Sequence, residues 1–276
     1  MDIKTIVVEL GGDAAQEARL QAAVDIARLS GGHIVGVTAT GFRLEAFRGA
    51  GDEVGHYAEL AARKLREASQ QSADGFHQSV ERMAPGQACT HHAVEEEPGW
   101  ALARAGRVAD LILPASPQVT PPAPTAMAHS AEYVLMHAGR PVLVMPPGVR
   151  LQRDGHAVVA WNGRREAARA VADALPWLAA ASRVTVVTVD ENGGGQDGGD
   201  GDGAALLTYL ARHGIAAEVR REAGPAGEVL LATARSLKAG LLVAGGYGHS
   251  RVRELVLGGA TRALLGNADI PLLLSH

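Results

Sequence analysis

Residues 5–12 read TIVVELGG, and the stretch returns as HAVVAWNG at residues 156–163, an offset of 151. Each copy is a short β-rich run that ends in or just before glycine. An Ala-rich amphipathic stretch follows each copy, over residues 13–29 and 164–181. A strand pattern followed by a helical pattern is typical of a βαβ unit. The repetition therefore predicts two related halves in one chain.

The similarity between the halves continues to their ends, where the offset falls to 130. The first half has the longer middle, because residues 53–83 predict a long helix where the second half has only residues 203–213. The matched end segments are 109–113 with 239–243 and 140–144 with 270–274. Two fused copies of one fold explain this pattern.

Strand and helix patterns alternate through each half, which predicts an α/β fold with a parallel sheet covered by helices on both faces. Aromatic residues are only 4% of the chain and hydrophobic residues are 47%, so Ala, Val, Leu and Ile must build the cores. Pro and Gly residues interrupt both patterns over residues 146–155. We therefore expect domains at residues 1–147 and 156–276.

Composition excludes several classes of protein. The net charge of −4 argues against a general nucleic-acid binder. The single cysteine, Cys89, rules out an internal disulfide and a four-thiolate zinc module, so a reducing compartment is the simplest setting. No signal-peptide core precedes the first strand, and no apolar run approaches the ~20 residues that span a bilayer. We expect a soluble cytoplasmic protein with neither membrane nor nucleic acid as a partner.

A glycine-rich segment in the second half carries the sharpest functional signal. Gly245-Gly246-Tyr247-Gly248 follows the apolar run 241–244, and nine residues, beginning with His249, separate it from Gly258-Gly259-Ala260-Thr261. Glycine lets backbone N–H groups approach an anion closely, and a helix start carries partial positive charge. The segment predicts a phosphate cradle, to which His249 can add charge.

The pattern Gly-x-x-Gly, nine residues, Gly-(Ser/Thr) resembles the nucleotide-binding signature of the universal stress protein family. Gly245, Gly248 and Gly258 match it, whereas Gly259 stands where the family has Ser or Thr, and Thr261 follows two residues later. The resemblance covers nearly the whole chain as two tandem domains. It implies Rossmann-like domains of the adenine nucleotide alpha hydrolase type, each with five parallel strands in the order 3-2-1-4-5.

The resemblance also implies a ligand, and residues to hold it. The family's acidic residue after the first strand falls on Asn162, which Gly163 follows, and the end of the second strand, Thr188 and Val189, would border the base. Such a site lies at the switch point of an open parallel sheet. It would take an adenine nucleotide, ATP in first place, with Mg²⁺ as a candidate companion, in a stress-response regulator.

Assembly is a further implication of the resemblance. The family pairs domains through the last strand, so residues 141–145 and 271–275 are expected to join the halves as an intramolecular pseudo-dimer. Association of two whole chains into a homodimer stays open.

The first half lacks the glycine motif. At the offset of 130, its positions hold Ala115, Gln118, Ala128, His129 and Ala131, and nearby prolines remove backbone donors. We therefore expect the second half alone to bind a nucleotide.

The sequence supports no catalytic or metal-binding residue. No lysine follows glycine as in a Walker A loop, and neither first strand leads into Gly-x-Gly-x-x-Gly. Cys89, His91 and His92 lack a second ligand pair at zinc spacing. Two alternatives to a nucleotide-binding regulator remain: a nucleotide-free interaction or scaffold protein of the same fold, and a slow ATP hydrolase.

Overall fold

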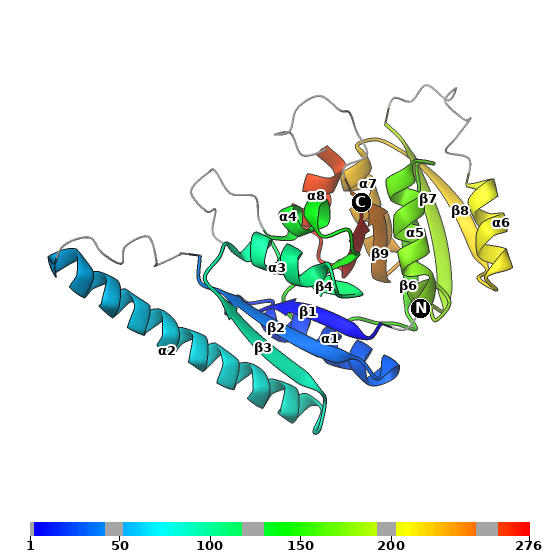
Figure 1. Ribbon diagram of the computed structural model, residues 1–276. Coiled ribbons are helices and arrows are strands. Elements are labelled where there is room, and N and C mark those ends of the chain that lie inside the picture. Colours follow the sequence, from blue (N-terminus) through cyan, green and yellow to red (C-terminus); the bar gives the residue numbers. More distant parts are fainter. Residues whose placement is uncertain (1–2, 42–51, 118–129, 192–202, 247–258) are drawn as a thin grey trace.

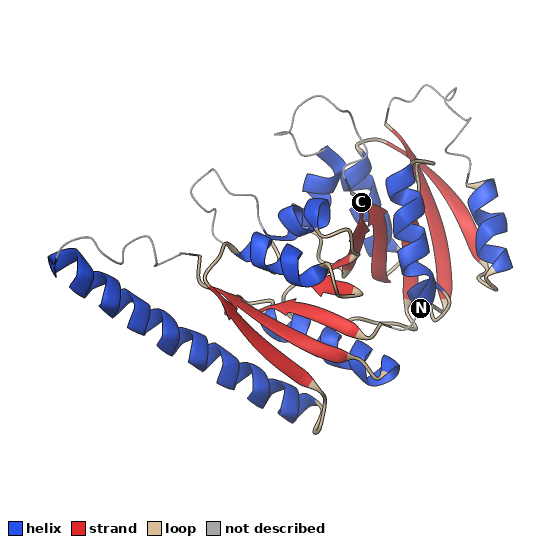
Figure 2. Ribbon diagram, in the orientation of Figure 1, coloured by secondary structure: helices blue, strands red, loops and turns tan. Residues whose placement is uncertain are grey.

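Short apolar strands, covered on both sides by helices, form the centre of the computed structural model, which describes residues 3–41, 52–117, 130–191, 203–246 and 259–276 (Figure 2). The strands are β1 (Thr5–Glu9), β2 (His33–Ala39), β3 (Cys89–Val94), β4 (Leu111–Leu113), β5 (Val142–Val144), β6 (His156–Ala160), β7 (Arg183–Asp190), β8 (Ala217–Ala223), β9 (Ala239–Gly245) and β10 (Leu272–Ser275). The helices are α1 (Gln16–Ser30), α2 (Asp52–Met83), α3 (Pro98–Gly106), α4 (Ser130–His137), α5 (Arg165–Leu178), α6 (Ala204–Arg212), α7 (Ala226–Ser236) and α8 (Gly259–Asn267).

All the strands belong to one ten-stranded sheet, in the order β3-β2-β1-β4-β5-β10-β9-β6-β7-β8 (Figure 1). Each half contributes five strands in the order 3-2-1-4-5, and the pairs within each half are parallel. The expected α/β fold with two related halves is confirmed.

The two halves meet at an antiparallel seam between β5 and β10. Leu143 lies opposite Leu273, flanked by the pairs Val142 with Leu274 and Val144 with Leu272. Leu143 and Leu273 are fully buried, with 0% exposure. The pairing of the halves through residues 141–145 and 271–275 is therefore confirmed.

Buried apolar side chains form two continuous cores, one on each face of the sheet. Helices α1, α2, α5 and α6 cover the first face, and α3, α4, α7 and α8 cover the second. Alternation along the strands assigns residues to the faces: Leu143 packs into the first core, whereas Val142 and Val144 pack into the second. Both cores run across the seam.

The long helix expected over residues 53–83 is α2, which begins at Asp52. Phe76 and Val80, in its C-terminal half, are buried against the sheet at 1% exposure each. The N-terminal half extends past the sheet edge (Figure 1). None of the described helices is long and apolar enough to cross a membrane.

Candidate functional site

The expected nucleotide crevice is the carboxyl edge of β6 and β9, which are neighbours in the sheet. The chain leaves β6 toward β7 on one side and leaves β9 toward β10 on the other. Connections that diverge in this way create a switch point, the usual ligand position in open parallel sheets. The sequence-predicted residues can be located relative to this point.

Asn162 and Gly163 lie directly after β6. The Asn162 side chain is exposed, and its Oδ1 accepts the backbone N–H of Arg164 at 3.1 Å. Gly163 has a φ of +73°, a conformation that favours glycine. These two residues form the turn that leads into α5.

Thr188 and Val189 belong to the last residues of β7, the strand beside β6. Both are partly buried, and they pair with Arg221 and Glu222 of β8. They therefore end at the same sheet edge as Asn162.

The glycine-rich segment is described only at its two ends. Gly245 is the last residue of β9, Gly259 is the first residue of α8, and Thr261 is buried in the first turn of α8. Gly248, His249 and Gly258 lie outside the described residues. The strand order brings Gly245 to the same edge as Asn162, Thr188 and Val189.

Close packing surrounds the first two glycines of the motif. A Cβ on Gly245 would lie 2.5 Å from the backbone N of Ala167 and from the backbone C of Glu166 in α5. A Cβ on Gly246 would lie 2.5 Å from Cδ2 of Leu135, which belongs to α4 of the first half. The obstacle at Gly245 is backbone, so packing alone requires glycine there, whereas a side chain at Gly246 would displace the end of the Leu135 side chain.

Gly246 is also held by the end of β10. Its N–H donates to the Ser275 carbonyl at 2.8 Å, and its own carbonyl lies 3.0 Å from Nδ1 of His276. The entrance of the glycine-rich segment is therefore fixed by both halves of the chain, a feature that the sequence does not reveal.

Glu166 places an acidic group beside Gly245. Its side chain is 8% exposed and pairs with the guanidinium of Arg165. Burial would raise the pKa of Glu166, but hydrogen bonds from Arg165 and from the backbone outweigh that effect and hold it below its usual value. The carboxylate is ionised at neutral pH and favours the N-terminal turn of α5.

The matching edge of the first half is built differently. Ile6 of β1 pairs with Leu111 of β4, and Ala157 of β6 pairs with Leu241 of β9 in the same way. Counting along the strands from these pairs, Glu9 is equivalent to Ala160. Ala115 is likewise equivalent to Gly245. Glu9 is 7% exposed, and its Oε2 accepts the backbone N–H of Ala115 at 2.6 Å and the Ser130 hydroxyl at 2.7 Å. A carboxylate therefore fills this edge of the first half.

A buried ion pair supports Glu9. The Arg19 side chain is 0% exposed, and it donates to both carboxylate oxygens of Asp13, at 2.8 and 2.6 Å. Arg19 also donates to the backbone carbonyl of Glu9 at 3.0 Å. Burial opposes ionisation of Asp13, but the hydrogen bonds and charge of Arg19 prevail and lower its pKa.

Sequence reasoning missed the cluster of Glu9, Asp13 and Arg19. One signal was present: the repeat aligns Glu9, at the end of an otherwise apolar strand, with the small apolar residue Ala160. A carboxylate that ends a buried strand needs donors nearby. Those donors come from residues 106 and 121 positions later, which no local pattern connects to Glu9.

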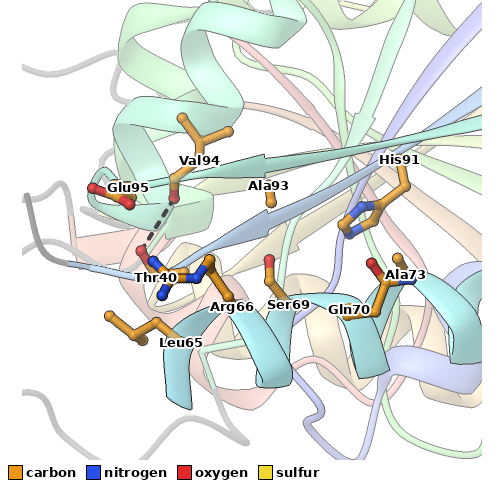
Figure 3. A pocket seen from close by; sticks show the side chains of 10 residues that line it. All are labelled: Thr40, Leu65, Arg66, Ser69, Gln70, Ala73, His91, Ala93, Val94 and Glu95. Atoms are coloured by element: carbon orange, nitrogen blue, oxygen red, sulfur yellow. Dashed lines mark hydrogen bonds between the residues drawn. The ribbon is translucent and has the colours of Figure 1, made fainter. Parts of the chain in front are cut away.

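A separate cavity of about 330 Å³ lies between α2 and the edge strand β3 (Figure 3). Its lining comprises Thr40, Leu65, Arg66, Ser69, Gln70, Ala73, His91, Ala93, Val94 and Glu95. His91 bonds Thr38 Oγ1 through Nε2 at 2.9 Å, while burial lowers its pKa. The hydroxyl of Ser69 is buried without a hydrogen-bond partner among the described residues.

Ser69→Ala is expected to raise the free energy of unfolding by about 1 kcal/mol, because it removes a buried hydroxyl that forms no hydrogen bond. Ser72→Ala in the same helix is the matched control. The Ser72 hydroxyl bonds Thr38 Oγ1 at 2.7 Å, so its removal should lower stability. Urea denaturation of both variants measures the two effects, and a loss in Ser69→Ala would contradict the assignment.

The described residues contain no group of three or more His, Cys, Asp or Glu side chains arranged to hold a metal ion. His91 and Cys89 are in β3, where His91 bonds Thr38 and Cys89 Sγ lies 3.4 Å from Nδ1 of His77.

Comparison with known proteins agrees with this architecture. Residues 155–276 match the model of the universal stress protein family. None of the curated proteins matches the sequence. A universal stress protein from Archaeoglobus fulgidus DSM 4304 is similar in structure, with a TM-score of 0.74 and 17% identity over 98% of this chain and 95% of its own. A functionally unknown protein from Pseudomonas aeruginosa PAO1 is also similar in structure, with a TM-score of 0.63 and 18% sequence identity. The match covers 99% of this chain and 92% of that protein. The second half of the chain, residues 155–276, therefore matches the universal stress protein family, and the first half has the same strand order as the second.

Proposed function

We propose that the second half binds an adenine nucleotide, with ATP as the first candidate, and that the chain is a regulator in the stress response. The observation that carries the proposal is the convergence of Asn162, Thr188, Val189 and Gly245 on one edge of the sheet, at the switch point between β6 and β9. Helix α8 begins at Gly259, after the glycine-rich segment.

Each predicted residue has a chemical role in this proposal. Backbone N–H groups of Gly245, Gly248 and Gly258–Gly259 would bind the phosphates, because glycine allows a close approach. His249 would add positive charge, and the Thr261 hydroxyl would support the start of α8. Asn162 would hydrogen-bond the ribose, with Gly163 beside it.

The base and the metal ion need different partners. Thr188 and Val189 are half-buried, and would border the adenine ring. Mg²⁺ prefers phosphate oxygens, waters and one or two carboxylates, and Glu166 is an acidic group beside Gly245 that could contribute. When bound, the metal would neutralise phosphate charge.

The domain boundaries are part of the same proposal. We assign residues 1–147 to a structural partner domain and residues 156–276 to the nucleotide-binding domain. Strand β5 ends at Val144 and β6 begins at His156, so the connection lies between the two. The first half would support the second through the seam and through the contact of Leu135 with Gly246.

Isothermal titration with ATP, ADP and AMP at millimolar concentration tests the proposal. Wild type should bind one nucleotide per chain, and the double variant Gly248→Val, Gly258→Val should lose it, because valine blocks close approach to the phosphates. The matched control carries valine at the first-half positions Gln118 and Ala128, and should bind as wild type does. Absence of heat with all three nucleotides would refute the proposal.

A nucleotide-free scaffold protein is the second candidate, and packing favours it. Glycine at position 245 is required by its contact with the backbone of α5, so no ligand is needed to explain it. Asn162 Oδ1 already accepts a bond from Arg164. Nucleotide retained through purification, identified by absorbance and mass spectrometry, would decide against the scaffold.

A further inference from the structure

Glu9 lies in the first half at a place where the second half has no acidic side chain. Its counterpart is Ala160, which ends β6 as Glu9 ends β1. Val7 packs into the core covered by α3 and α4, and alternation along the strand puts Glu9 on the same face. The carboxylate therefore points toward the side of the sheet on which α4 begins.

Two donors from distant parts of the first half converge on one oxygen of this carboxylate. The backbone N–H of Ala115, just beyond β4, donates at 2.6 Å, and the hydroxyl of Ser130, the first residue of α4, donates at 2.7 Å. Both distances are short, as expected for hydrogen bonds to an ionised acceptor. Ala115 after β4 and Ser130 at the start of α4 therefore supply two donors to one carboxylate oxygen, as the donors of an oxyanion site do.

Charge adds to the same environment. Burial is the largest influence and raises the pKa of Glu9 above its ordinary value, while the bonds from Ala115 and Ser130 and the charge of Arg19 act in the opposite direction and favour the ionised form. Among the described residues, Arg19 and Asp13 are the charged groups that act on Glu9. Arg19 is anchored by its own bonds to Asp13 and to the Glu9 carbonyl, so its positive charge is fixed in place.

We propose that Glu9 is an internal ligand, whose carboxylate occupies an oxyanion site in the first half and closes this edge to an external phosphate or carboxylate group. The site consists of the Ala115 N–H and the Ser130 hydroxyl, beside the charge of Arg19. The contact is autoinhibitory: the first half retains the donors for an anion and satisfies them from its own β1. It holds whether or not the second half binds a nucleotide.

Glu9→Ala tests the proposal, because it leaves the two donors without an acceptor and leaves space for a small anion. The variant is made in the Gly248→Val, Gly258→Val background, so that anion binding in the second half does not contribute. Thermal unfolding is followed in sodium acetate, in sodium phosphate, and in sodium chloride at matched ionic strength. The two oxyanion arms distinguish a carboxylate-sized site from a phosphate-sized one.

The expected result is that acetate or phosphate stabilises Glu9→Ala, with a folding equilibrium raised about tenfold at an anion concentration ten times the dissociation constant. Glu9→Gln is the matched control: it fills the same space, still accepts both bonds and should not respond. Glu9→Ala combined with Ser130→Ala should respond less than Glu9→Ala alone. Equal responses to chloride and to both oxyanions would overturn the proposal.

A second measurement decides the matter if Glu9→Ala does not fold under any condition. Carboxyl ¹³C NMR follows the titration of Glu9 in otherwise wild-type protein and in Ser130→Ala. Loss of the hydroxyl donor should raise the pKa of Glu9, because that bond stabilises the ionised form. An unchanged pKa would show that Ser130 does not hold Glu9 as an anion, and would overturn the proposal.

Discussion

Asp13→Ala is expected to lower the free energy of unfolding by about 3–5 kcal/mol, because it leaves the Arg19 guanidinium buried without its carboxylate partner. The Arg19 side chain is 0% exposed, and both of its bonds to a side chain go to Asp13. Nε of Arg19 already lacks a partner among the described residues, so the site has little capacity to compensate. Urea denaturation at neutral pH measures the loss.

Two further variants separate the ion pair from other effects of the substitution. Asp25→Asn in α1 removes a carboxylate that bonds only the Gln21 amide among the described partners, and should change stability little. The double variant Asp13→Ala, Arg19→Met should recover part of the loss, since an apolar side chain replaces the unpaired charge. A double variant as unstable as Asp13→Ala would contradict this explanation.

The same ion pair predicts a dependence on pH. The folded-state pKa of Asp13 is lowered, so its contribution is complete above the ordinary value of 3.8 and is lost as the pH falls through the lower, folded-state value. The stability difference between wild type and Asp13→Ala should therefore shrink in acid. A difference that stays constant down to the lowest pH at which both proteins fold would count against the ion pair.

Gly245→Ala is the second large effect, with an expected loss of about 1–3 kcal/mol from overpacking. The new Cβ would meet two backbone atoms of α5 at 2.5 Å, and backbone cannot rotate away as a side chain can. The first turn of α5 would have to shift, and it carries Glu166 and Ala167. Chemical denaturation measures the loss of stability.

Gly266→Ala in α8 is the matched control for Gly245→Ala. A Cβ there has no heavy atom within 4 Å, and alanine favours helix, so stability should rise by up to about 1 kcal/mol. Opposite signs for the two substitutions are the expected outcome. If both variants were equally stable, close packing at Gly245 would not be the reason for glycine there.

Local patterns were sufficient to predict the parallel strands of each half, whereas the pairing of the halves through their last strands was predicted from the family resemblance. Residues 5–9 and 156–160 are apolar runs that can only be buried between helices, and the repeated endings at residues 140–144 and 270–274 specify equivalent strands. The helical pattern over residues 53–83 likewise predicted α2 from local sequence alone. Resemblance to a known family supplied the strand order, which periodicity alone does not determine.

Contacts between distant residues were beyond the reach of the sequence. Glycine at 246 reads as part of a phosphate loop, yet its neighbour is Leu135, 111 positions earlier and in the other half. Glu9 reads as the polar end of a strand, and only the fold brings Ala115 and Ser130 to it. These contacts depend on how the helices pack over the sheet. The residues that neighbour Gly246 and Glu9 in the sequence do not determine that packing.

The β5–β10 seam has a consequence for how this molecule can change over evolutionary time. When two identical subunits join about a two-fold axis, every substitution appears on both sides of the interface at once. Here one chain supplies both sides, so each position across the pseudo-axis can mutate alone. The covalent connection also makes pairing independent of protein concentration. Equivalent positions of the two halves can therefore carry different residues, as they do where Glu9 is buried in the first half and Ala160 stands at the equivalent position of the second.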